Sequence, residues 1–472
     1  MTSIAGMAPP PAEAGPWSPT ARFTASALAA GRGLHRTEEV HAWLADRMAV
    51  HTFAVTPIPF AELDQWTAQP GTGNLAHASG RFFSVEGLRV KTDYGPVPEW
   101  SQPIVNQPEI GILGILVKEF DGVLHCLMSA KMEPGNVNLL QISPTVQATR
   151  SNYTRAHRGS ATAYLEYFLD RVPGSRVLVD VLQSEQGAWF HGKRNRNMVV
   201  EIEHDIEIGP DYCWMTFHQL FELLSHDNLV NMDARTVLSC VPFAPPGTDP
   251  LNPSGPNPLG HAELLSWFTE ARTRYFLEAH QVPLNDVRGW HRTATEIAHD
   301  EGRYFRVIAV SVAATGREVA SWTQPLIAPC EDGLVAMYVR RVAGELQALL
   351  HIRVEPGYRD TIELAPTVQA TVSNYTGLPP ESWPPLLAMA VDADPASIIY
   401  DTLLSEEGGR FHHALNRYRV IEVDESFEPP ASTDFRWVPV GLLTELLRHS
   451  HYVNVQARSL VASLHSLWAV RR

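Results

Sequence analysis

The chain has 472 residues, of which 44% are apolar and 19% charged, a composition typical of globular proteins and a length that suggests about three domains. Its formal net charge of −15 argues against a nucleic-acid or membrane partner, because such anionic surfaces require clustered Lys and Arg. The four cysteines form no CxxC pair, so the sequence indicates neither a zinc site nor a disulfide framework, and a cytoplasmic protein is expected.

Residues 1–20 are rich in Pro and Ala and lack the basic start and apolar run of a signal peptide, so we predict a disordered tail. Two similar halves follow, at 21–243 and 261–472, and a Pro/Gly-rich linker at 244–260 joins them. The chain is therefore predicted to carry two copies of one domain.

The periodicities change in the same order in both halves. Helical spacing at 38–49 and 262–280 comes first, and alternating apolar residues on both sides of Asp121-Gly122 and Ala343-Gly344 then predict hairpins. The turn Glu133-Pro134-Gly135 and its counterpart at 355–357 are typical of type II, with a glycine at positive φ.

Later segments complete the predicted domain. Buried strands are predicted at 175–184 and 396–405, and amphipathic helices at 216–227 and 440–450. We therefore expect an α/β (α+β) fold in which each half has a mixed sheet flanked by helices.

The most conspicuous repeat is PTVQATRSNYT at 144–154, which returns as PTVQATVSNYT at 366–376 with ten of eleven positions identical. Alternation along a strand would place Thr145, Gln147 and Thr149 on one face, where they contact either a polar ligand or neighbouring loops. The amide of Asn152 or Asn374 can donate to a carbonyl oxygen, and the phenol of Tyr153 or Tyr375 can stack on a base or donate a proton, although a half-buried structural Tyr is more common.

A second motif is also doubled. QSEQGAWFHGKRNRN at 183–197 matches LSEEGGRFHHALNRY at 404–418. A carboxylate with an imidazole six residues later is a usable acid and base, and this describes Glu185 with His191 and Glu406 with His412. A structural ion pair between Glu185 and Arg196 is the alternative.

Basic side chains near both motifs could neutralise a diphosphate: Lys131, Arg150, Arg196, Arg353 and Arg417. The halves differ in two places. Val372 stands where the first half has Arg150, and residues 155–172 permit a helix whereas four prolines at 377–394 forbid one. The two pockets therefore need not do the same work.

Together the doubled motifs resemble those of the NDP-hexose 2,3-dehydratases of antibiotic deoxysugar biosynthesis, over about residues 20–472. The resemblance implies two tandem Nudix-like domains, a homodimer, the substrate dTDP-4-keto-6-deoxyglucose and a downstream 3-ketoreductase that consumes the labile product. It also implies that no metal or redox cofactor is needed, and the Glu-rich metal-binding helix of Nudix hydrolases is absent from this sequence.

The implied reaction removes the proton on carbon 3, acidified by the ketone at carbon 4, and expels hydroxide from carbon 2. Under this hypothesis Glu185 or Glu406 is the base, His191, His412, Tyr153 or Tyr375 the acid, and Asn152 or Asn374 the ketone contact. Gln147, Gln369, Thr149 and Thr371 would contact the sugar or pyrimidine, and the first half is favoured as the reacting one. A nucleotide-sugar hydrolase and a non-catalytic binding protein remain as alternatives.

Overall fold

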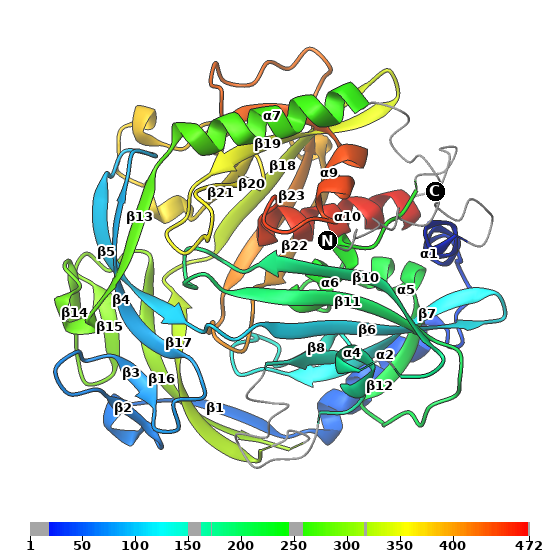
Figure 1. Cartoon of the computed structure of the whole chain (residues 1–472), viewed down its shortest axis with the longest axis horizontal. Coiled ribbons are helices and arrows are strands. Elements are labelled where there is room, and N and C mark those ends of the chain that lie inside the picture. The colour runs from blue at the N-terminus through cyan, green and yellow to red at the C-terminus, as the bar shows by residue number, and fades with distance from the viewer. Residues whose placement is uncertain (1–17, 150–161, 171, 245–257, 316–318, 471–472) are drawn as a thin grey trace, which may run out of the picture.

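The computed structural model describes residues 18–149, 162–170, 172–244, 258–315 and 319–470. Most of the predicted tail and most of the predicted linker lie outside these ranges. Within them the strands form four sheets, two large and two small, with helices packed around the large ones (Figure 1). The chain is thus a mixed α+β protein, as the periodicities predict.

The two large sheets have the same plan, one in each repeat. In the first, the strand order is β10-β11-β6-β7-β12, with β8 and β9 at the ends of β7 and β6, and the second has the matching order β22-β23-β18-β19, with β20, β21 and β24 added. Among the described strands, only the pairs β6–β11 and β18–β23 are parallel. The strands are β6 (Gly111–Phe120), β7 (Val123–Met132), β8 (Leu140–Ser143), β9 (Val146–Ala148), β10 (Ser175–Ser184), β11 (Arg194–Ile202), β12 (Tyr212–Thr216), β18 (Gly333–Val342), β19 (Glu345–Arg353), β20 (Glu363–Ala365), β21 (Val368–Ala370), β22 (Ile398–Ser405), β23 (Leu415–Glu422) and β24 (Phe435–Pro439).

Both predicted hairpins are confirmed. Phe120 pairs with Val123 across Asp121-Gly122, and Val342 pairs with Glu345 across Ala343-Gly344. All four turn residues have positive φ, as a two-residue type I′ turn requires.

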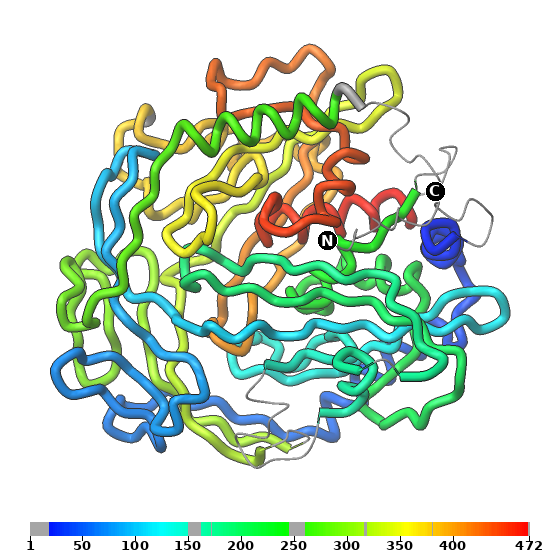
Figure 2. The backbone as a smooth tube through the Cα atoms, in the orientation of Figure 1, coloured from blue at the N-terminus to red at the C-terminus, as the bar shows by residue number. Residues whose placement is uncertain are grey.

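Strands cross between the repeats in the two small sheets. Strand β1, from the first repeat, pairs along its whole length with β16 of the second, and β13 of the second pairs with β4 of the first (Figure 1). The strands are β1 (Phe53–Ile58), β14 (Trp290–Arg292), β15 (Glu296–His299), β16 (Phe305–Ala314) and β17 (Ser321–Pro329) in one sheet, and β2 (Trp66–Ala68), β3 (Leu75–His77), β4 (Ser84–Thr92), β5 (Glu99–Asn106) and β13 (Leu277–Val282) in the other. Each small sheet is therefore completed by a strand from the other repeat, and Figure 2 shows the green chain entering the blue sheet.

The helices agree with the predictions only in part. The predicted helix 38–49 is confirmed as α2 (Thr37–Val50), whereas α7 (Pro258–Arg274) ends early because residues after Arg274 form β13. The other helices are α1 (Pro19–Ala27), α4 (Glu166–Leu169), α5 (Phe217–Leu223), α6 (Met232–Ser239), α8 (Leu387–Val391), α9 (Val440–Leu446) and α10 (Val455–Val470). Short 3-10 turns lie at Phe60–Glu62, Leu284–Asp286, Val372–Asn374, Pro380–Ser382 and Pro395–Ser397.

Helix α10 connects the two repeats through the core. It packs against α5 and α6 of the first repeat and against β18 and β23 of the second (Figure 1). Its residues Val455 to Ser466 are all buried, because this helix has neighbours on nearly every side. Among the described residues, no helix is long and apolar enough to cross a membrane.

Candidate functional site

The Glu-Pro-Gly turn of each repeat contacts the Ser-Glu motif of the other repeat. The amide of Gly135, in the first repeat, donates to the carbonyl oxygen of Gly408 at 2.7 Å, and the amide of His413 donates to the carbonyl oxygen of Gly135 at 2.7 Å. The second repeat repeats the contact, since the amide of Gly357 donates to Gly187 at 2.7 Å. Each Glu-Pro-Gly turn is therefore seated on the Ser-Glu loop of the other repeat.

The predicted turn type is wrong. The amide of Asn136 donates to the carbonyl oxygen of Glu133, which closes the turn, but neither Gly135 nor Gly357 has positive φ, so the turns are not type II. Glycine is required here for space, because a Cβ on Gly135 would overlap the carbonyl oxygen of Phe411 in the opposite loop.

The shared PTVQAT segment forms a wall beside the Glu-Pro-Gly turn, since Gln147 is hydrogen-bonded to Glu133. Thr145 does not face a ligand as predicted. Its buried hydroxyl accepts from the amide of Leu116 at 2.8 Å and donates to the carbonyl oxygen of Leu127, so both of these hydrogen bonds hold the sheet together. The prediction for Thr145 is corrected by this placement.

Gln147 instead connects a carboxylate to an amide. Its Nε2 donates to Glu133 at 2.6 Å, and its Oε1 accepts from Asn231 at 3.3 Å. The second repeat has the same series of hydrogen bonds, in which Gln369 donates to Glu355 at 3.1 Å and accepts from Asn454 at 2.8 Å. Both glutamines therefore have a structural partner at each end.

Two of the predicted cations lie beside this wall. Lys131 donates to the carbonyl oxygen of Gln147 at 3.1 Å, and Arg353 donates to Glu355 at 2.7 Å and to the carbonyl oxygen of Gln369. Burial lowers the pKa of Arg353, but attraction to charged neighbours, above all the adjacent carboxylate of Glu355, raises it. The net effect is a raised pKa.

The other two described arginines lie elsewhere. Arg196 pairs with Asp180 at 2.6 Å, and Arg417 pairs with Asp401 at 2.6 Å, and both arginine side chains are partly exposed. Asn195, the strand neighbour of Arg196, points inward to Glu185, so alternation turns Arg196 to the opposite face. This placement contradicts the predicted diphosphate contact of both arginines and also the alternative ion pair between Glu185 and Arg196.

The two motif glutamates differ in their hydrogen bonds. Glu406 accepts from Asn416 and Tyr418, each at 2.6 Å, and from Gln186 at 2.7 Å. Glu185 accepts from Asn195 at 2.7 Å, and its buried Oε2 has no hydrogen-bond partner among the described residues. The difference follows from the sequence. Tyr418 and Gln186 donate to Glu406, whereas the equivalent positions around Glu185 are Asn197 and Glu407.

Burial raises the pKa of Glu185, whereas Arg458, the Asn195 amide and Lys193 oppose the rise. Burial also lowers the pKa of Lys193 to about 8. Lys193 belongs to the first repeat alone, since Ala414 is its counterpart. The buried surroundings of Glu185 thus favour a carboxyl group that can gain and lose a proton.

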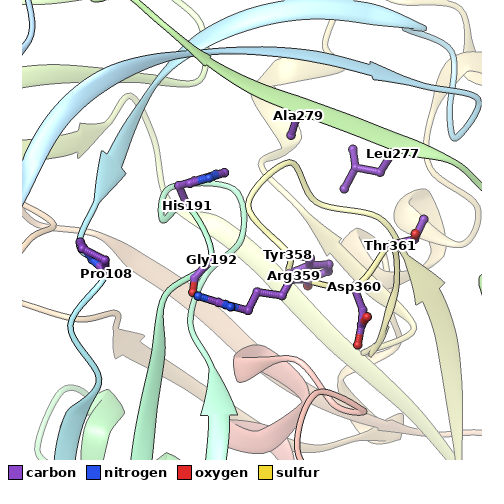
Figure 3. A pocket seen from close by; sticks show the side chains of 9 residues that line it. All are labelled: Pro108, His191, Gly192, Leu277, Ala279, Tyr358, Arg359, Asp360 and Thr361. Atoms are coloured by element: carbon purple, nitrogen blue, oxygen red, sulfur yellow. The ribbon is translucent and has the colours of Figure 1, made fainter.

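The histidines of the motif do not pair with its glutamates. His191 lines a cavity of about 450 Å³ between the repeats, and its charged neighbours are Glu86 and Arg359 (Figure 3). Burial lowers the pKa of His191, and burial together with His413 and Arg306 lowers that of His412 to about 4. The predicted Glu–His acid and base pairs are therefore not brought together.

The cavity beside His191 is polar and draws on both repeats. Figure 3 shows Arg359 reaching toward Gly192, whose carbonyl oxygen accepts from its Nε at 3.1 Å. The remaining lining residues are Pro108, Leu277, Ala279, Tyr358, Asp360 and Thr361.

The segment after the wall is described only in the second repeat. Arg150, Asn152 and Tyr153 lie outside the described residues. Asn374 accepts from the amide of Tyr304 at 3.3 Å, and burial raises the pKa of Tyr375, which lies within electrostatic reach of Arg353. Thr149 and Thr371 are partly buried at the ends of β9 and β21.

Comparison with known proteins decides the family. The family model described as NDP-hexose 2,3-dehydratase matches residues 37–241 and again 261–464. The chain belongs to the NDP-hexose 2,3-dehydratase family. The resemblance predicted from the doubled motifs is thereby confirmed.

Three relatives in this family match nearly full length. Each is named dTDP-4-dehydro-6-deoxy-alpha-D-glucopyranose 2,3-dehydratase: one of Saccharopolyspora spinosa is 58% identical over 96% of both chains. One of Amycolatopsis orientalis is 50% identical over 93% of this chain and 92% of its own, and one of Streptomyces violaceoruber is 47% identical over 91% and 97%.

Family membership does not explain two buried carboxyl groups that sequence reasoning missed. Asp233, at the start of α6, is 3% exposed and its Oδ1 has no hydrogen-bond partner, and the same holds for Oε2 of Glu407. The second repeat has Gln456 where the first has Asp233, and the first has Gln186 where the second has Glu407. Within the described residues, no three His, Cys, Asp or Glu side chains are grouped to hold a metal ion.

Proposed function

We propose that this chain is a sugar-nucleotide 2,3-dehydratase that converts dTDP-4-keto-6-deoxy-D-glucose into dTDP-3,4-diketo-2,6-dideoxy-D-glucose. The observation that carries the proposal is the 47–58% identity, over at least 91% of the chain, to three proteins named for this activity. Elimination requires a base at carbon 3, a proton donor at carbon 2 and hydrogen bonds to the ketone oxygen.

Glu185 is the proposed base. Its buried Oε2 has no hydrogen-bond partner in the described part of the chain, so accepting a proton there breaks no hydrogen bond within that part. Glu406, by contrast, is held by three donors, and protonating it would disrupt that set. This difference supports the first repeat as the reacting one and gives Glu406 a structural role.

The wall and the segment that follows it would hold the substrate. Lys131 and Arg150 are the proposed diphosphate contacts, Thr149 contacts the sugar or pyrimidine, and Asn152 and Tyr153 approach the ketone. In the second repeat Arg353, Thr371, Asn374 and Tyr375 would form the corresponding nucleotide contacts.

Separate Glu185→Gln and Glu406→Gln proteins test the assignment. Incubation with the 4-keto sugar and a ketoreductase that traps the labile product, followed by mass spectrometry, measures the loss of one water. We expect Glu185→Gln to lose turnover by about 100-fold or more. Full activity of Glu185→Gln would overturn the role of Glu185, and release of dTMP by the native protein would indicate hydrolysis instead.

Finer features remain proposals. We propose that the repeats span 21–243 and 261–472, that each is Nudix-like, and that the protein is a cytoplasmic homodimer. A downstream 3-ketoreductase would consume its product on the way to an antibiotic deoxysugar. The matched plans of the two large sheets support the repeat boundaries, and light scattering would test the homodimer.

A further inference from the structure

The loop that carries Glu407 lies against the Glu-Pro-Gly turn of the first repeat although it belongs to the second. A Cβ on Gly408 would lie 3.0 Å from the Cβ of Glu133, and one on Gly409 would lie 3.6 Å from Oε1 of Glu133. The amide of Gly135 fixes this approach through its hydrogen bond to the carbonyl oxygen of Gly408. Glu407 is thereby held next to the first-repeat site.

Three carboxyl groups from separate segments share one feature. Among the described residues, Glu185, Asp233 and Glu407 each have one buried oxygen without a hydrogen-bond partner. They also interact electrostatically, because the Glu185 carboxylate is a neighbour that raises the pKa of both Asp233 and Glu407. Burial is the larger cause in each case, and it raises the pKa of Glu407 to about 7, with Arg410 opposing the rise.

In the other half, two of the three equivalent positions carry amides instead of carboxyl groups. There Glu406 is accompanied by Gln186 and Gln456, whose amides cannot exchange a proton in this way. Gln186 is instead bonded to Glu406. At these three equivalent positions, the side of Glu185 therefore has carboxyl groups where the side of Glu406 has two amides.

The elimination still needs an acid that protonates the hydroxyl leaving carbon 2. The charged neighbours of His191 are Glu86 and Arg359 rather than Glu185, so His191 lies apart from the proposed base. We propose that Glu407, contributed by the second repeat, is the general acid that protonates the leaving hydroxyl in the first-repeat site. This inference rests on the proposed function and adds a catalytic residue to it.

The proton balance of the reaction closes with these two groups. The carboxylate of Glu185 takes the proton from carbon 3, the bond between carbon 2 and its oxygen breaks, a double bond forms between carbons 2 and 3, and the acid of Glu407 gives its proton to the departing hydroxyl, which leaves as water. The enol then accepts the Glu185 proton at carbon 2 and returns its hydroxyl proton to Glu407. Both carboxyl groups finish as they began.

A change of leaving group isolates this role. We compare native protein with full-length Glu407→Gln on the natural 4-keto sugar and on its analogue with fluorine in place of the 2-hydroxyl, because fluoride leaves without a proton. The amide is compatible with the loop, since Gln186 occupies the same position in the first repeat. We expect Glu407→Gln to lose at least about 100-fold on the natural substrate and to approach native turnover on the fluoro analogue.

Two further proteins complete the design. Glu185→Gln should lose activity on both substrates, because the base is needed for each. Asp401→Asn, which alters an ion pair on the outer face with Arg417, should match native protein on both. Equal losses of Glu407→Gln on the two substrates, or no loss on either, would overturn the proposal, whereas a native protein that never eliminates water would overturn the dehydratase function itself.

Discussion

The guanidinium of Arg235, in the first repeat, donates a hydrogen bond of 2.6 Å to the backbone carbonyl oxygen of Ser405 in the second. Arg458 makes the equivalent bond of 2.5 Å to Ser184. Both arginines are fully buried, and each also donates to a carbonyl oxygen at the start of its own helix. The strand ends that precede Glu185 and Glu406 are therefore each fixed from the opposite repeat.

Replacing either buried arginine should destabilise the whole chain. Arg235→Met leaves two buried carbonyl oxygens without their donor, and each such loss costs roughly 1–3 kcal/mol. We expect a decrease of about 3–5 kcal/mol in the free energy of unfolding in urea titrations. The exposed Arg341→Met should change it by less than about 0.5 kcal/mol, and an equally small effect at Arg235 would contradict the bridging role.

The Glu-Pro-Gly turn provides a test of packing between the repeats. Gly135→Ala would place a Cβ on the carbonyl oxygen of Phe411, which belongs to backbone and cannot move aside easily. We expect a loss of at least about 2 kcal/mol of stability together with reduced turnover. Gly209→Ala is the matched control, because its Cβ would meet only the Tyr212 ring at 3.4 Å, and similar melting temperatures for the two variants would refute the argument.

Stability should depend on pH through Glu363. Its carboxyl accepts from Ser184 at 2.7 Å, and burial, opposed by that hydrogen bond and by Arg458, raises its pKa from 4.5 to about 8. The folded state therefore holds a proton that the unfolded state has lost between these values, so this contribution is complete below pH 4.5 and disappears as pH rises through about 8.

Glu363→Gln removes the titration and retains an acceptor, as Gln141 does for Ser405 at 2.8 Å in the first repeat. The variant should gain stability relative to native protein as pH rises from 5 to 9, on the order of 2–4 kcal/mol. Thermal unfolding across this range measures the difference. A parallel pH profile for native and variant proteins would count against it, and Glu345→Gln, at an exposed position, serves as the control.

The repeats should not fold separately. A fragment of residues 18–244 lacks β13, which covers the whole of the β4 edge from Gly87 to Thr92, and its own β1 loses β16. We expect each fragment alone to aggregate or remain unfolded and the two together to recover a soluble, active complex on co-expression. Gel filtration and circular dichroism of single fragments would decide, and a stable monomeric fragment would contradict the expectation.

Local pattern was enough for much of the fold. The hairpins follow from turn residues that accept positive φ, and β10 follows from a run of apolar residues at 175–184, because these signals lie within a few neighbouring positions. The helix expected at 262–280 was too long, since β13 is specified by its pairing with β4 of the other repeat, a contact far away in sequence.

The site was less predictable for the same reason. Glu185 was identified from its motif, but its separation from His191 and its proximity to Glu407 depend on loops that cross between repeats. The predicted diphosphate contact of Arg196 was wrong because side chains alternate along β11. Asn195 faces Glu185, and Arg196 lies on the opposite face of the sheet. The one available signal for Asp233 and Glu407 was a comparison of the two halves, in which each faces a glutamine at the equivalent position.

Covalent fusion gives the crossed loops a freedom that two identical chains would lack. In a symmetric pair of identical subunits, any substitution appears at both equivalent positions. Here Glu407 and Gln186 are separate residues, as are Asp233 and Gln456, so one side can acquire a carboxylate while the other keeps an amide. The exchanged strands hold the halves together as a pair, and the single polypeptide allows that pair to specialise.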